Sequence, residues 1–326
     1  MSNRTKDDPE AERTLSQLFA HARPRPLPPA ADAEEIRRAV YAEWDAVTGR
    51  RIWLRRSGFA AAATVLLTVG LWFGSDLLPT VPPVLVARVE RVQGAVVAGD
   101  RTPLTSGSAL VGATTVTTGE GQLALRLVNG GSLRIGPNSE VVLAGPDAAE
   151  LLAGVLYFDS EGQRAGDDFM VMTKLGTVRD VGTQFLARVD NDRSLLDVGV
   201  RAGRVIVTRD GESDAAGVGE RLVATQDTGA IQRGAIATFG TEWDWAERLA
   251  PPFDIDGRTV IDFLAWFAAQ TGRRVVFGSP AAESVARETI LRGSIELEPL
   301  QKLSAVLALT DLTFSLEGER VVIDTR

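Results

Sequence analysis

One long apolar segment constrains how this chain can be organised. From Gly58 to Gly74 the sequence is GFAAAATVLLTVGLWFG, without a charged side chain. A helix of this length spans about 25 Å, close to the thickness of the hydrocarbon core of a bilayer. We therefore expect a transmembrane helix over residues 58–74. The transmembrane residues are expected to include Gly58, Phe59, Val65, Leu66, Leu67, Leu71, Trp72 and Gly74.

The residues on either side of this segment predict its orientation. Four arginines precede it, at positions 50, 51, 55 and 56, whereas Ser75, Asp76 and a proline-rich run follow it. Positive charges favour the cytoplasmic side of a membrane, so we expect the N-terminus inside and the C-terminus outside. A buried core helix and a cleavable signal sequence are the alternatives. The long polar tail before the segment disfavours cleavage, and its all-round apolar surface disfavours a core helix.

The composition limits the chemistry of the chain. Its 326 residues carry a formal net charge of -8, which gives no support to direct nucleic-acid binding. There is no cysteine, and the single histidine is His21 in the N-terminal tail. Disulfides, thiolate metal sites and cysteine nucleophiles are thereby excluded, and histidine-based sites are disfavoured. We expect no enzyme activity, no metal ion and no cofactor.

Residues 1–57 are the expected cytoplasmic tail, which the proline-rich stretch 24–29 divides into two short helical candidates. The second places four apolar residues on one helical face, namely Ile36, Val40, Tyr41 and Trp44. A tail with so few apolar groups does not build a core alone. It either folds against a partner protein through this face or remains a solvated, partly disordered tail.

Residues 75–86 contain Pro79, Pro82 and Pro83 and are expected to form a stiff linker. From residue 87 to 240, apolar and polar residues alternate in short runs separated by glycine, asparagine and aspartate. After one such run, Asn129-Gly130 suits a two-residue hairpin turn. This pattern predicts a compact all-β domain, which can be a sandwich, a barrel or a stack of strands.

A series of motifs in this region resembles the FecR domain, in order and without large gaps. The motifs are Val116–Leu125 (VTTGEGQLAL), Asn129–Asn138 (NGGSLRIGPN), Leu152–Phe158 (LAGVLYF), Phe169–Thr173 (FMVMT), Val181–Phe185 (VGTQF) and Val200–Val207 (VRAGRVIV). The most specific part is Gly182-Thr183-x-Phe185 followed by Gly203-x-Val205. FecR domains form the periplasmic part of transmembrane regulators of extracytoplasmic-function sigma factors. The resemblance therefore implies an inner-membrane protein that acts in signal transduction, such as the regulation of iron transport.

We expect the motif residues to be mainly structural. Gly182 permits a sharp turn, Thr183 can form local hydrogen bonds, and Phe185 supplies a buried aromatic ring. The β region contains no acid pair, Gly-x-Ser-x-Gly elbow or phosphate-binding loop. Asp167-Asp168 and Asp190-Asn191-Asp192 lack the spacing of a calcium loop and are expected to mark hairpin turns.

Two segments near the end of the β region are expected to be connections. The stretch Glu212–Glu220 (ESDAAGVGE) is small and polar, which predicts a mobile loop. Residues 241–252 are assigned as a linker, with a short helix over 241–248. Trp243 and Trp245 in that helix are expected to pack the domains together or to contact a partner.

Residues 253–326 are expected to form a small α+β domain of two strand-helix-strand units. The first helix carries apolar residues at helical spacing from Val260 and stops at Gly272, before a β run at Arg274–Phe277. In the second unit Thr289–Leu297 is expected to be extended. A helix then begins at Pro299 and a hairpin turns at Glu317-Gly318.

This region resembles the short N-terminal domain of secretins and TonB-dependent receptors. The resemblance rests on Phe253-x-Ile255, Gln270-Thr271-Gly272, and Leu291-x-Gly293 followed by Leu297–Leu307. It implies a domain that contacts proteins, for example by strand addition at a sheet edge, and that has no catalytic role.

Taken together, the resemblances imply a single-pass signal transducer. Its periplasmic part would meet a periplasmic or outer-membrane receptor, and its tail would restrain or activate an extracytoplasmic-function sigma factor. The tail is shorter than is typical of such regulators. The alternative is a membrane-anchored structural protein that binds cell-envelope polysaccharide or peptidoglycan and has no sigma-factor partner. Deleting the tail would change transcription only in the first case.

Overall fold

The structure is a computed structural model that describes residues 84–161, 168–192, 194–227 and 230–326. The transmembrane helix expected over 58–74 and the partner-contact face expected within residues 36–44 lie outside this part of the chain. Among the described residues, no helix is both long enough and apolar enough to cross a membrane. The described part comprises an all-β domain and a C-terminal domain of helices and strands.

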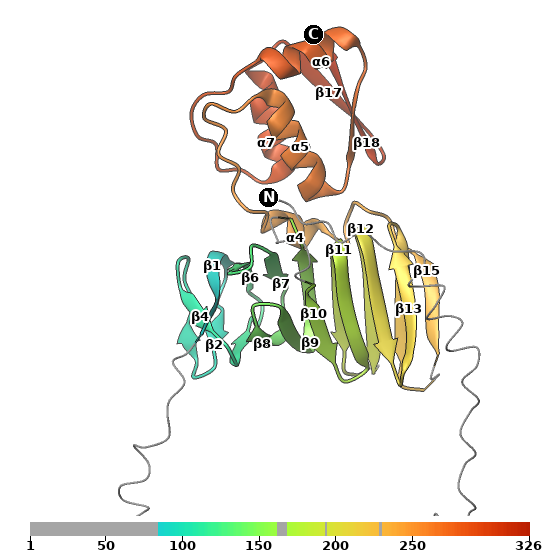
Figure 1. Cartoon of the computed structure of the whole chain (residues 1–326). Helices are drawn as coiled ribbons and strands as arrows, with labels where there is room; N and C mark the ends of the chain where they lie inside the picture. Colours follow the sequence, from blue (N-terminus) through green and yellow to red (C-terminus); the bar gives the residue numbers. More distant parts are fainter. Residues whose placement is uncertain (1–83, 162–167, 193, 228–229) are drawn as a thin grey trace, which may run out of the picture. The chain divides into compact units, whose positions relative to one another are not determined.

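Fifteen strands in the described residues form one hydrogen-bonded network (Figure 1). They are β1 (Leu85–Gln93), β2 (Val97–Ala98), β3 (Thr102–Pro103), β4 (Ala109–Val111), β5 (Thr114–Thr117), β6 (Gln122–Leu127), β7 (Ser132–Ile135), β8 (Glu140–Gly145), β9 (Ala148–Asp159), β10 (Met170–Thr173), β11 (Gly176–Asp190), β12 (Leu195–Arg209), β13 (Glu212–Gly217), β14 (Glu220–Thr225) and β15 (Ile231–Ala235). The pairing is antiparallel except between β9 and β10. The all-β prediction for this region is confirmed.

Three long strands, β9, β11 and β12, belong to two layers at once. The second half of β11 pairs with the second half of β9 and the first half of β12, whereas its first half pairs with β10 and the end of β12. One layer therefore has the order β15-β14-β12-β11-β9-β7-β6-β1-β4. The other has the order β13-β12-β11-β10-β9-β8-β5-β2-β3. Of the three arrangements left open by the sequence, this is a stack of strands in two layers.

One hydrophobic core fills the space between the layers. Phe158 and Phe185 enter it from the first layer, and Val171 and Val205 enter it from the second, each with no exposed surface. The Phe158 ring stacks on the ring of Phe169, with centroids 4.1 Å apart. Because side chains alternate along a strand, every second residue of these strands reaches this core. The alternation seen in the sequence thus explains the two-layered arrangement.

Glycines mark the points where the long strands pass between layers. Gly154 in β9, Gly182 in β11 and Gly203 in β12 have φ angles of +87°, +68° and +74°. This left-handed region is accessible to glycine at little steric cost. A Cβ atom at Gly203 would also collide with the carbonyl oxygen of Gly182. The bends of β11 and β12 therefore lie against each other and leave no room for a side chain at Gly203.

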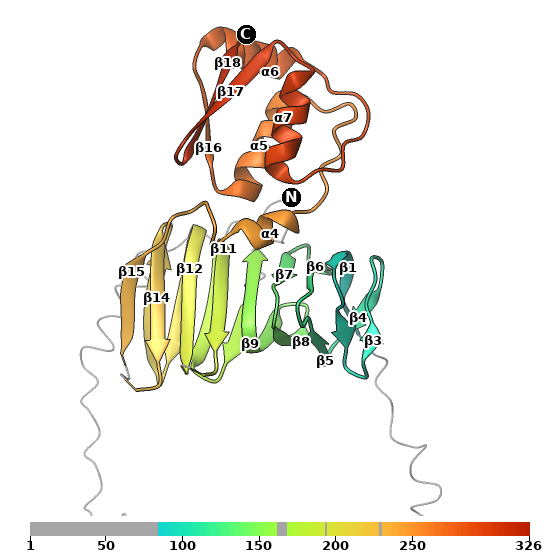
Figure 2. The same cartoon turned by 180° about the vertical axis from the view of Figure 1, so that it is seen from behind.

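The C-terminal domain has a three-stranded sheet and three helices. Its elements are α5 (Val260–Thr271), β16 (Arg274–Phe277), α6 (Pro280–Glu288), α7 (Pro299–Ala308), β17 (Leu312–Glu317) and β18 (Arg320–Thr325). In the order β16-β18-β17, β16 is parallel to β18, and β17 forms the expected hairpin with β18. Helices α5 and α7 lie side by side (Figure 2). Phe263, Leu303 and Val321 contribute to the core that the helices share with the sheet.

Local signals explain where the predicted helices begin and end. The Thr259 side chain accepts a hydrogen bond from the Asp262 backbone, and the Asp262 carboxylate accepts one from the Thr259 backbone. This reciprocal pair satisfies backbone groups that the first turn of α5 leaves free. Gly272 ends α5 with a φ of +63°, and Pro299 occupies the first turn of α7.

Three sequence-based expectations were wrong, and one helix was missed. The stretch 212–220, expected to be a mobile loop, contains strand β13, because its backbone completes the ladder beside β12 despite its small side chains. Helix α6 was not expected, although Ser279 caps it and Pro280 occupies its first turn. Residues 253–255 form no strand, since Phe253 and Ile255 pack into the core from a loop. Residues 289–297, expected as the first strand of the second unit, form only an isolated bridge between Ile290 and Thr259.

Candidate functional site at the junction of the two domains

The outer face of the first layer carries a row of residues at one level. The cross-strand register places them opposite one another on seven neighbouring strands. The row consists of Arg91, Ala124, Arg134, Tyr157, Leu186, Gly199 and Arg221. In the central strands their neighbours in sequence point into the core, as Leu133 and Ile135 do on either side of Arg134. We call this set the docking row, because the segment between the domains lies on it.

That segment, residues 236–250, includes α4 (Asp244–Arg248) and covers the docking row. Its Ile236 and Trp243 pack with Tyr157 in a hydrophobic cluster separate from the main core. Trp243 is fully buried, and its Nε1 donates a hydrogen bond of 2.7 Å to the carbonyl oxygen of Ala237. A Cβ atom at Gly199 would lie 2.7 Å from Cδ1 of Ile236, so the segment lies directly on the strand backbone there. The tryptophans thus pack the connecting segment onto the β-domain. The expectation that they join the two domains or contact a partner stays a prediction.

Arg134 is a fully buried cation at the centre of the docking row. Its Nη1 donates to the carbonyl oxygen of Ala246 at 2.7 Å, and its Nη2 donates to Oε1 of Gln270 on α5. The guanidinium carbon lies 4.8 Å from the centroid of the Tyr157 ring. Burial lowers the pKa of Arg134 and raises the pKa of Tyr157. The hydrogen bond to Gln270 fixes the C-terminal domain directly to strand β7.

Arg201 joins four parts of the chain through one side chain. From β12, its Nε donates to the carbonyl oxygen of Thr238 at 2.8 Å and its Nη1 to that of Gln270 at 2.9 Å. Its Nη2 donates to Oε1 of Glu247 at 2.7 Å, and its guanidinium lies 4.4 Å from the Trp243 ring centroid. Only 3% of Arg201 is exposed. These contacts hold β12, the connecting segment, α4 and α5 in one arrangement.

Burial determines the electrostatics of the ion pair between Arg201 and Glu247. Burial raises the pKa of Glu247, and the neighbouring Arg201 partly opposes that rise. Nearer the surface, Glu242 accepts hydrogen bonds from Arg221 at 2.9 Å and from Arg188 at 3.4 Å. The hydrogen bond from Arg221 is the main reason that the pKa of Glu242 is lowered. The junction therefore has a buried ionic centre and a second ion-pair network at its edge.

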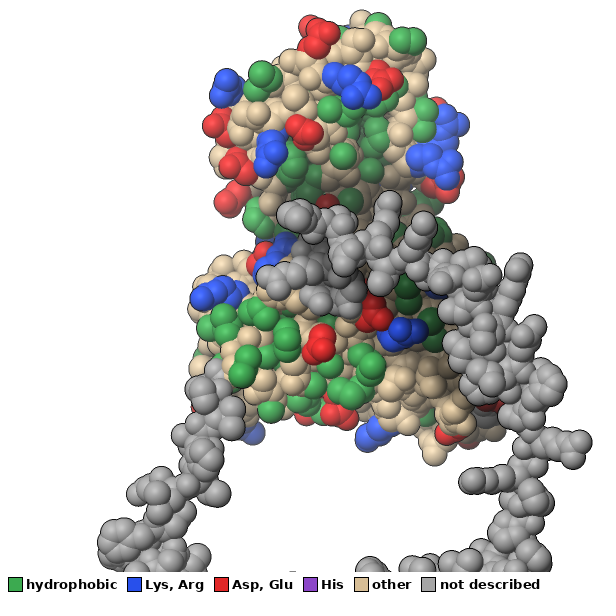
Figure 3. All heavy atoms as spheres, viewed as in Figure 1, with side chains coloured by type: hydrophobic (Ala, Val, Ile, Leu, Met, Phe, Trp, Pro, Cys, Tyr) green, Lys and Arg blue, Asp and Glu red, His purple; other side chains and the backbone are tan. Residues whose placement is uncertain are grey.

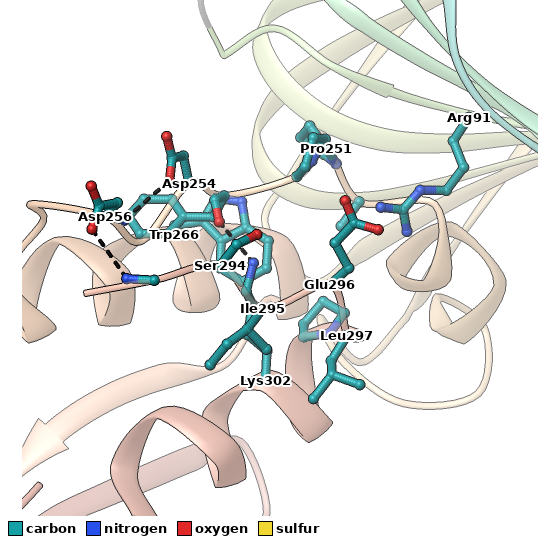
Figure 4. Close-up of a pocket in the computed structure, with 15 residues that line it drawn as sticks. Arg91, Pro251, Asp254, Asp256, Trp266, Ser294, Ile295, Glu296, Leu297 and Lys302 are labelled. Carbon is teal, nitrogen blue, oxygen red and sulfur yellow. Dashed lines mark hydrogen bonds between the residues drawn. The ribbon is translucent and has the colours of Figure 1, made fainter. Parts of the chain in front are cut away.

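A cavity of about 600 Å³ opens beside this junction (Figure 4). Phe253 and Trp266 line one side, and the stretch 293–297 lines another. Lys302 is 2% exposed, and its Nζ donates to the carbonyl oxygen of Phe253 at 2.7 Å and lies 5.4 Å from the Trp266 ring centroid. Arg91, from the β-domain, also lines the cavity. A buried amine beside aromatic rings and open space can hold an anionic or polar group.

The FecR motif residues lie away from both features. Gly182 and Gly203 are the two strand bends described above, whereas Phe185 and Val205 are buried in the core between the layers. Thr183 is buried, and its backbone N–H donates to Oδ1 of Asp180 at 2.7 Å, as does its hydroxyl group. Burial raises the pKa of Asp180. The structure thus places all five residues at the crossing between layers, and the expectation that they are mainly structural stays a prediction.

Sequence reasoning missed the residues that build the junction and the cavity. Arg134 and Arg201 stand between core-facing residues, where a sheet with one solvated face would expose them. The available signal was an arginine on several neighbouring strands together with the paired tryptophans of residues 241–248. Lys302 gave no such signal, because only the folded structure brings this residue of α7 against Phe253.

The arrangement is suited to binding and to holding domains together. Within the ranges described above, no group of three histidine, cysteine, aspartate or glutamate side chains is arranged to hold a metal ion. On the face seen in Figure 3, basic and acidic side chains are interspersed over both domains. The fold and the site define a two-domain β and α+β protein whose domains are joined by a buried arginine cluster.

Comparison with known families assigns the first of these domains. Residues 114–206 match the family described as FecR protein, from β5 to β12. The chain therefore carries a FecR domain, and the recognition based on its motif series is confirmed. The match ends before the C-terminal domain, so the resemblance of that domain to secretins and TonB-dependent receptors stays a prediction.

Two crystal structures of a candidate anti-sigma factor from Parabacteroides distasonis ATCC 8503 are similar to this chain. One is 16% identical, with a TM-score of 0.34, and the comparison covers 64% of this chain and 97% of that one. The other is 15% identical, with a TM-score of 0.35, and covers 65% and 99%. No curated protein matches the chain. The assignment of the FecR domain rests on the family match.

Proposed function

We propose that the chain is a single-pass inner-membrane regulator that couples a periplasmic or outer-membrane partner to an extracytoplasmic-function sigma factor. The observation that carries this proposal is the FecR domain at residues 114–206. The apolar segment 58–74 and the arginines before it support a cytoplasmic N-terminus and a periplasmic C-terminus. The stripe Ile36, Val40, Tyr41 and Trp44 is the proposed contact for the sigma factor.

The junction supports a role in transmission. Arg134 and Arg201 each form a buried hydrogen bond with Gln270. These bonds connect the C-terminal domain to the β-domain that contains the FecR match. A partner that bound one domain and altered this contact would also act on the other. Such a partner can shift the tail only by binding two states of the protein with different affinity. We propose binding alone as the activity, without catalysis.

A topology experiment tests the membrane half of the proposal. A reporter that is active only outside the cytoplasm is fused after Arg326, and a reporter that is active only inside is fused after Arg50. Activity of both fusions is expected. A C-terminal fusion that is active only in the cytoplasm would overturn both the regulator and the envelope-binding alternative.

A second experiment separates these two functions. Residues 1–57 are used to capture proteins from cells that express extracytoplasmic-function sigma factors, and a tail with Ile36, Val40, Tyr41 and Trp44 changed to serine serves as control. Capture by the natural tail alone supports the regulator. If neither tail captures a sigma factor and deletion of the tail leaves transcription unchanged, the envelope-binding function is favoured.

A further inference from the structure

The cavity beside the junction has the size and lining of a binding site. Its volume of about 600 Å³ falls within the range typical of small-ligand pockets. Aromatic surface from Phe253 and Trp266 meets polar groups from Lys302, Asp254 and Glu296. Figure 4 shows Lys302 reaching toward the carbonyl of Phe253 between Trp266 and the stretch that carries Ile295. The pocket thus combines an apolar wall with a buried charge.

One wall of the cavity is the stretch 293–297, which belongs to no helix or strand. Gly293 donates its N–H to Asp256, and Glu298 accepts from the backbone of Lys302. Between them, residues 294–297 have no backbone hydrogen bond within the described part of the chain. Ile295 packs toward the core of the domain, which holds the stretch in place. Backbone N–H and C=O groups that no other described residue pairs can pair with an extended chain that binds beside them.

Lys302 is a buried cation that has no carboxylate partner in the described residues. It is 2% exposed, and its only hydrogen bond is the one to the carbonyl oxygen of Phe253. Burial lowers its pKa, as does the nearby Arg91, whereas Asp254 and Glu296 oppose this shift only in part. Arg91, the second cation of the cavity, donates to the carbonyl oxygen of Arg248 and forms no ion pair among these residues. A carboxylate stabilises a buried ammonium group where the two are hydrogen-bonded in good geometry.

The acidic residues of the cavity are less buried and are partly engaged. Asp254 and Asp256 are exposed, and their carboxylates accept hydrogen bonds from the backbones of Asp256 and Gly293. Glu296 is exposed at the mouth of the cavity. Water screens these charges more than it screens Lys302. Lys302 therefore has a stronger influence than the three acidic residues on the charge of the group that binds in the cavity.

We propose that this cavity binds an extended peptide segment of another protein, which pairs its backbone with residues 294–297 and places a carboxylate against Lys302. An apolar side chain of the same segment packs on Phe253 and Trp266. The bound segment contacts both domains, because Arg91 comes from β1 and the other groups come from the C-terminal domain and the connection that leads to it. The inference depends on neither the membrane topology nor the sigma factor, so it can fail or hold independently of the proposed function.

The test uses a display library of random linear nine-residue peptides, selected on the purified full-length chain and on the Lys302→Met variant. Enrichment of peptides that carry aspartate or glutamate is expected on the natural chain only. Lys174→Met, at an exposed lysine, is the matched control and should retain the same peptides. The affinity of the best peptide is then measured by fluorescence anisotropy. It is compared with the affinity of the same peptide in which the aspartate or glutamate is replaced by asparagine or glutamine. Both the amide peptide and Lys302→Met should weaken binding at least about tenfold.

Two further variants test the backbone pairing. Glu296→Pro removes one N–H from the free stretch, whereas Glu296→Ala keeps it. The proline variant should bind the selected peptide at least about tenfold more weakly than the alanine variant. The proposal is overturned if no peptide is enriched, if basic or uncharged peptides dominate, or if Lys302→Met binds as the natural chain does. Equal binding by the two Glu296 variants would overturn the pairing with residues 294–297.

Discussion

The buried arginine of β12 offers the sharpest test of how the two domains are held together. In the Arg201→Met variant the side chain keeps a similar length and loses its charge and all its donors. Three hydrogen bonds are lost, to Thr238 at 2.8 Å, Gln270 at 2.9 Å and Glu247 at 2.7 Å. The Glu247 carboxylate is then left buried without its partner.

The expected size of the effect follows from that unpaired carboxylate. Removing one partner of a buried ion pair typically lowers the free energy of unfolding by about 3–5 kcal/mol. Glu247 is 9% exposed, so water compensates for little of the loss. The double variant Arg201→Met/Glu247→Gln should recover part of this free energy, because the amide carries no charge. A coupling of about 1 kcal/mol or more between the two sites is expected from their direct contact.

Urea unfolding of the full-length chain measures these quantities through tryptophan fluorescence. Trp243 reports on the junction and Trp266 on the C-terminal domain. Arg204→Met is the control, since Arg204 lies on the same strand and is exposed, and its effect should stay within about 0.5 kcal/mol. The Arg201 variant should also unfold in two separate transitions. A loss below about 1 kcal/mol in a single transition would refute the view that this arginine joins the domains.

Two further predictions concern other parts of the structure. Burial lowers the pKa of Lys302 from its ordinary 10.5, so the unfolded chain holds this proton to a higher pH than the folded chain does. The free energy of unfolding should therefore rise with pH between the folded pKa and about 10.5, and Lys302→Met should abolish that rise while Lys174→Met keeps it. A constant difference between the natural chain and Lys302→Met at every pH would contradict this. Gly203→Ala should destabilise the chain by more than about 2 kcal/mol because its Cβ meets the Gly182 carbonyl oxygen, whereas Gly182→Ala, with open space around its Cβ, should cost about 1–2 kcal/mol from its left-handed backbone alone. Equal losses in thermal or urea unfolding would show that the close approach of the two bends has no energetic weight.

The sequence predicted the elements whose signals are local. Alternating runs such as Leu123, Leu125 and Leu127 became strands with those residues in the core, and Asn129-Gly130 connects β6 to β7. Helix α5 ended at Gly272 because glycine adopts the left-handed conformation there. The FecR motif series could be recognised for a similar reason, since the glycines of its bends and the apolar residues of its core lie close together in the sequence.

The features that were missed depend on contacts between distant residues. Strand β13 consists of small and polar residues and is ordered by its ladder with β12. Arg134 is buried only because residues 236–250 lie over it, more than a hundred positions further along the chain. The cavity needs Phe253, Trp266 and Lys302 from three separate segments. Neither periodicity nor composition contains information on which outer face a later segment will cover.

The docking row limits which changes of length the domain can accept. In the central strands the row residue points outward and the residues on either side of it enter the core, as Leu156 and Phe158 do beside Tyr157. An insertion or deletion of one residue within such a strand would exchange the two faces beyond that point. It would place a charged or small residue in the core and a large apolar one under the connecting segment. Length variation among relatives of this chain should therefore be confined to the turns, and sequence drift in the seven strands should proceed by substitution.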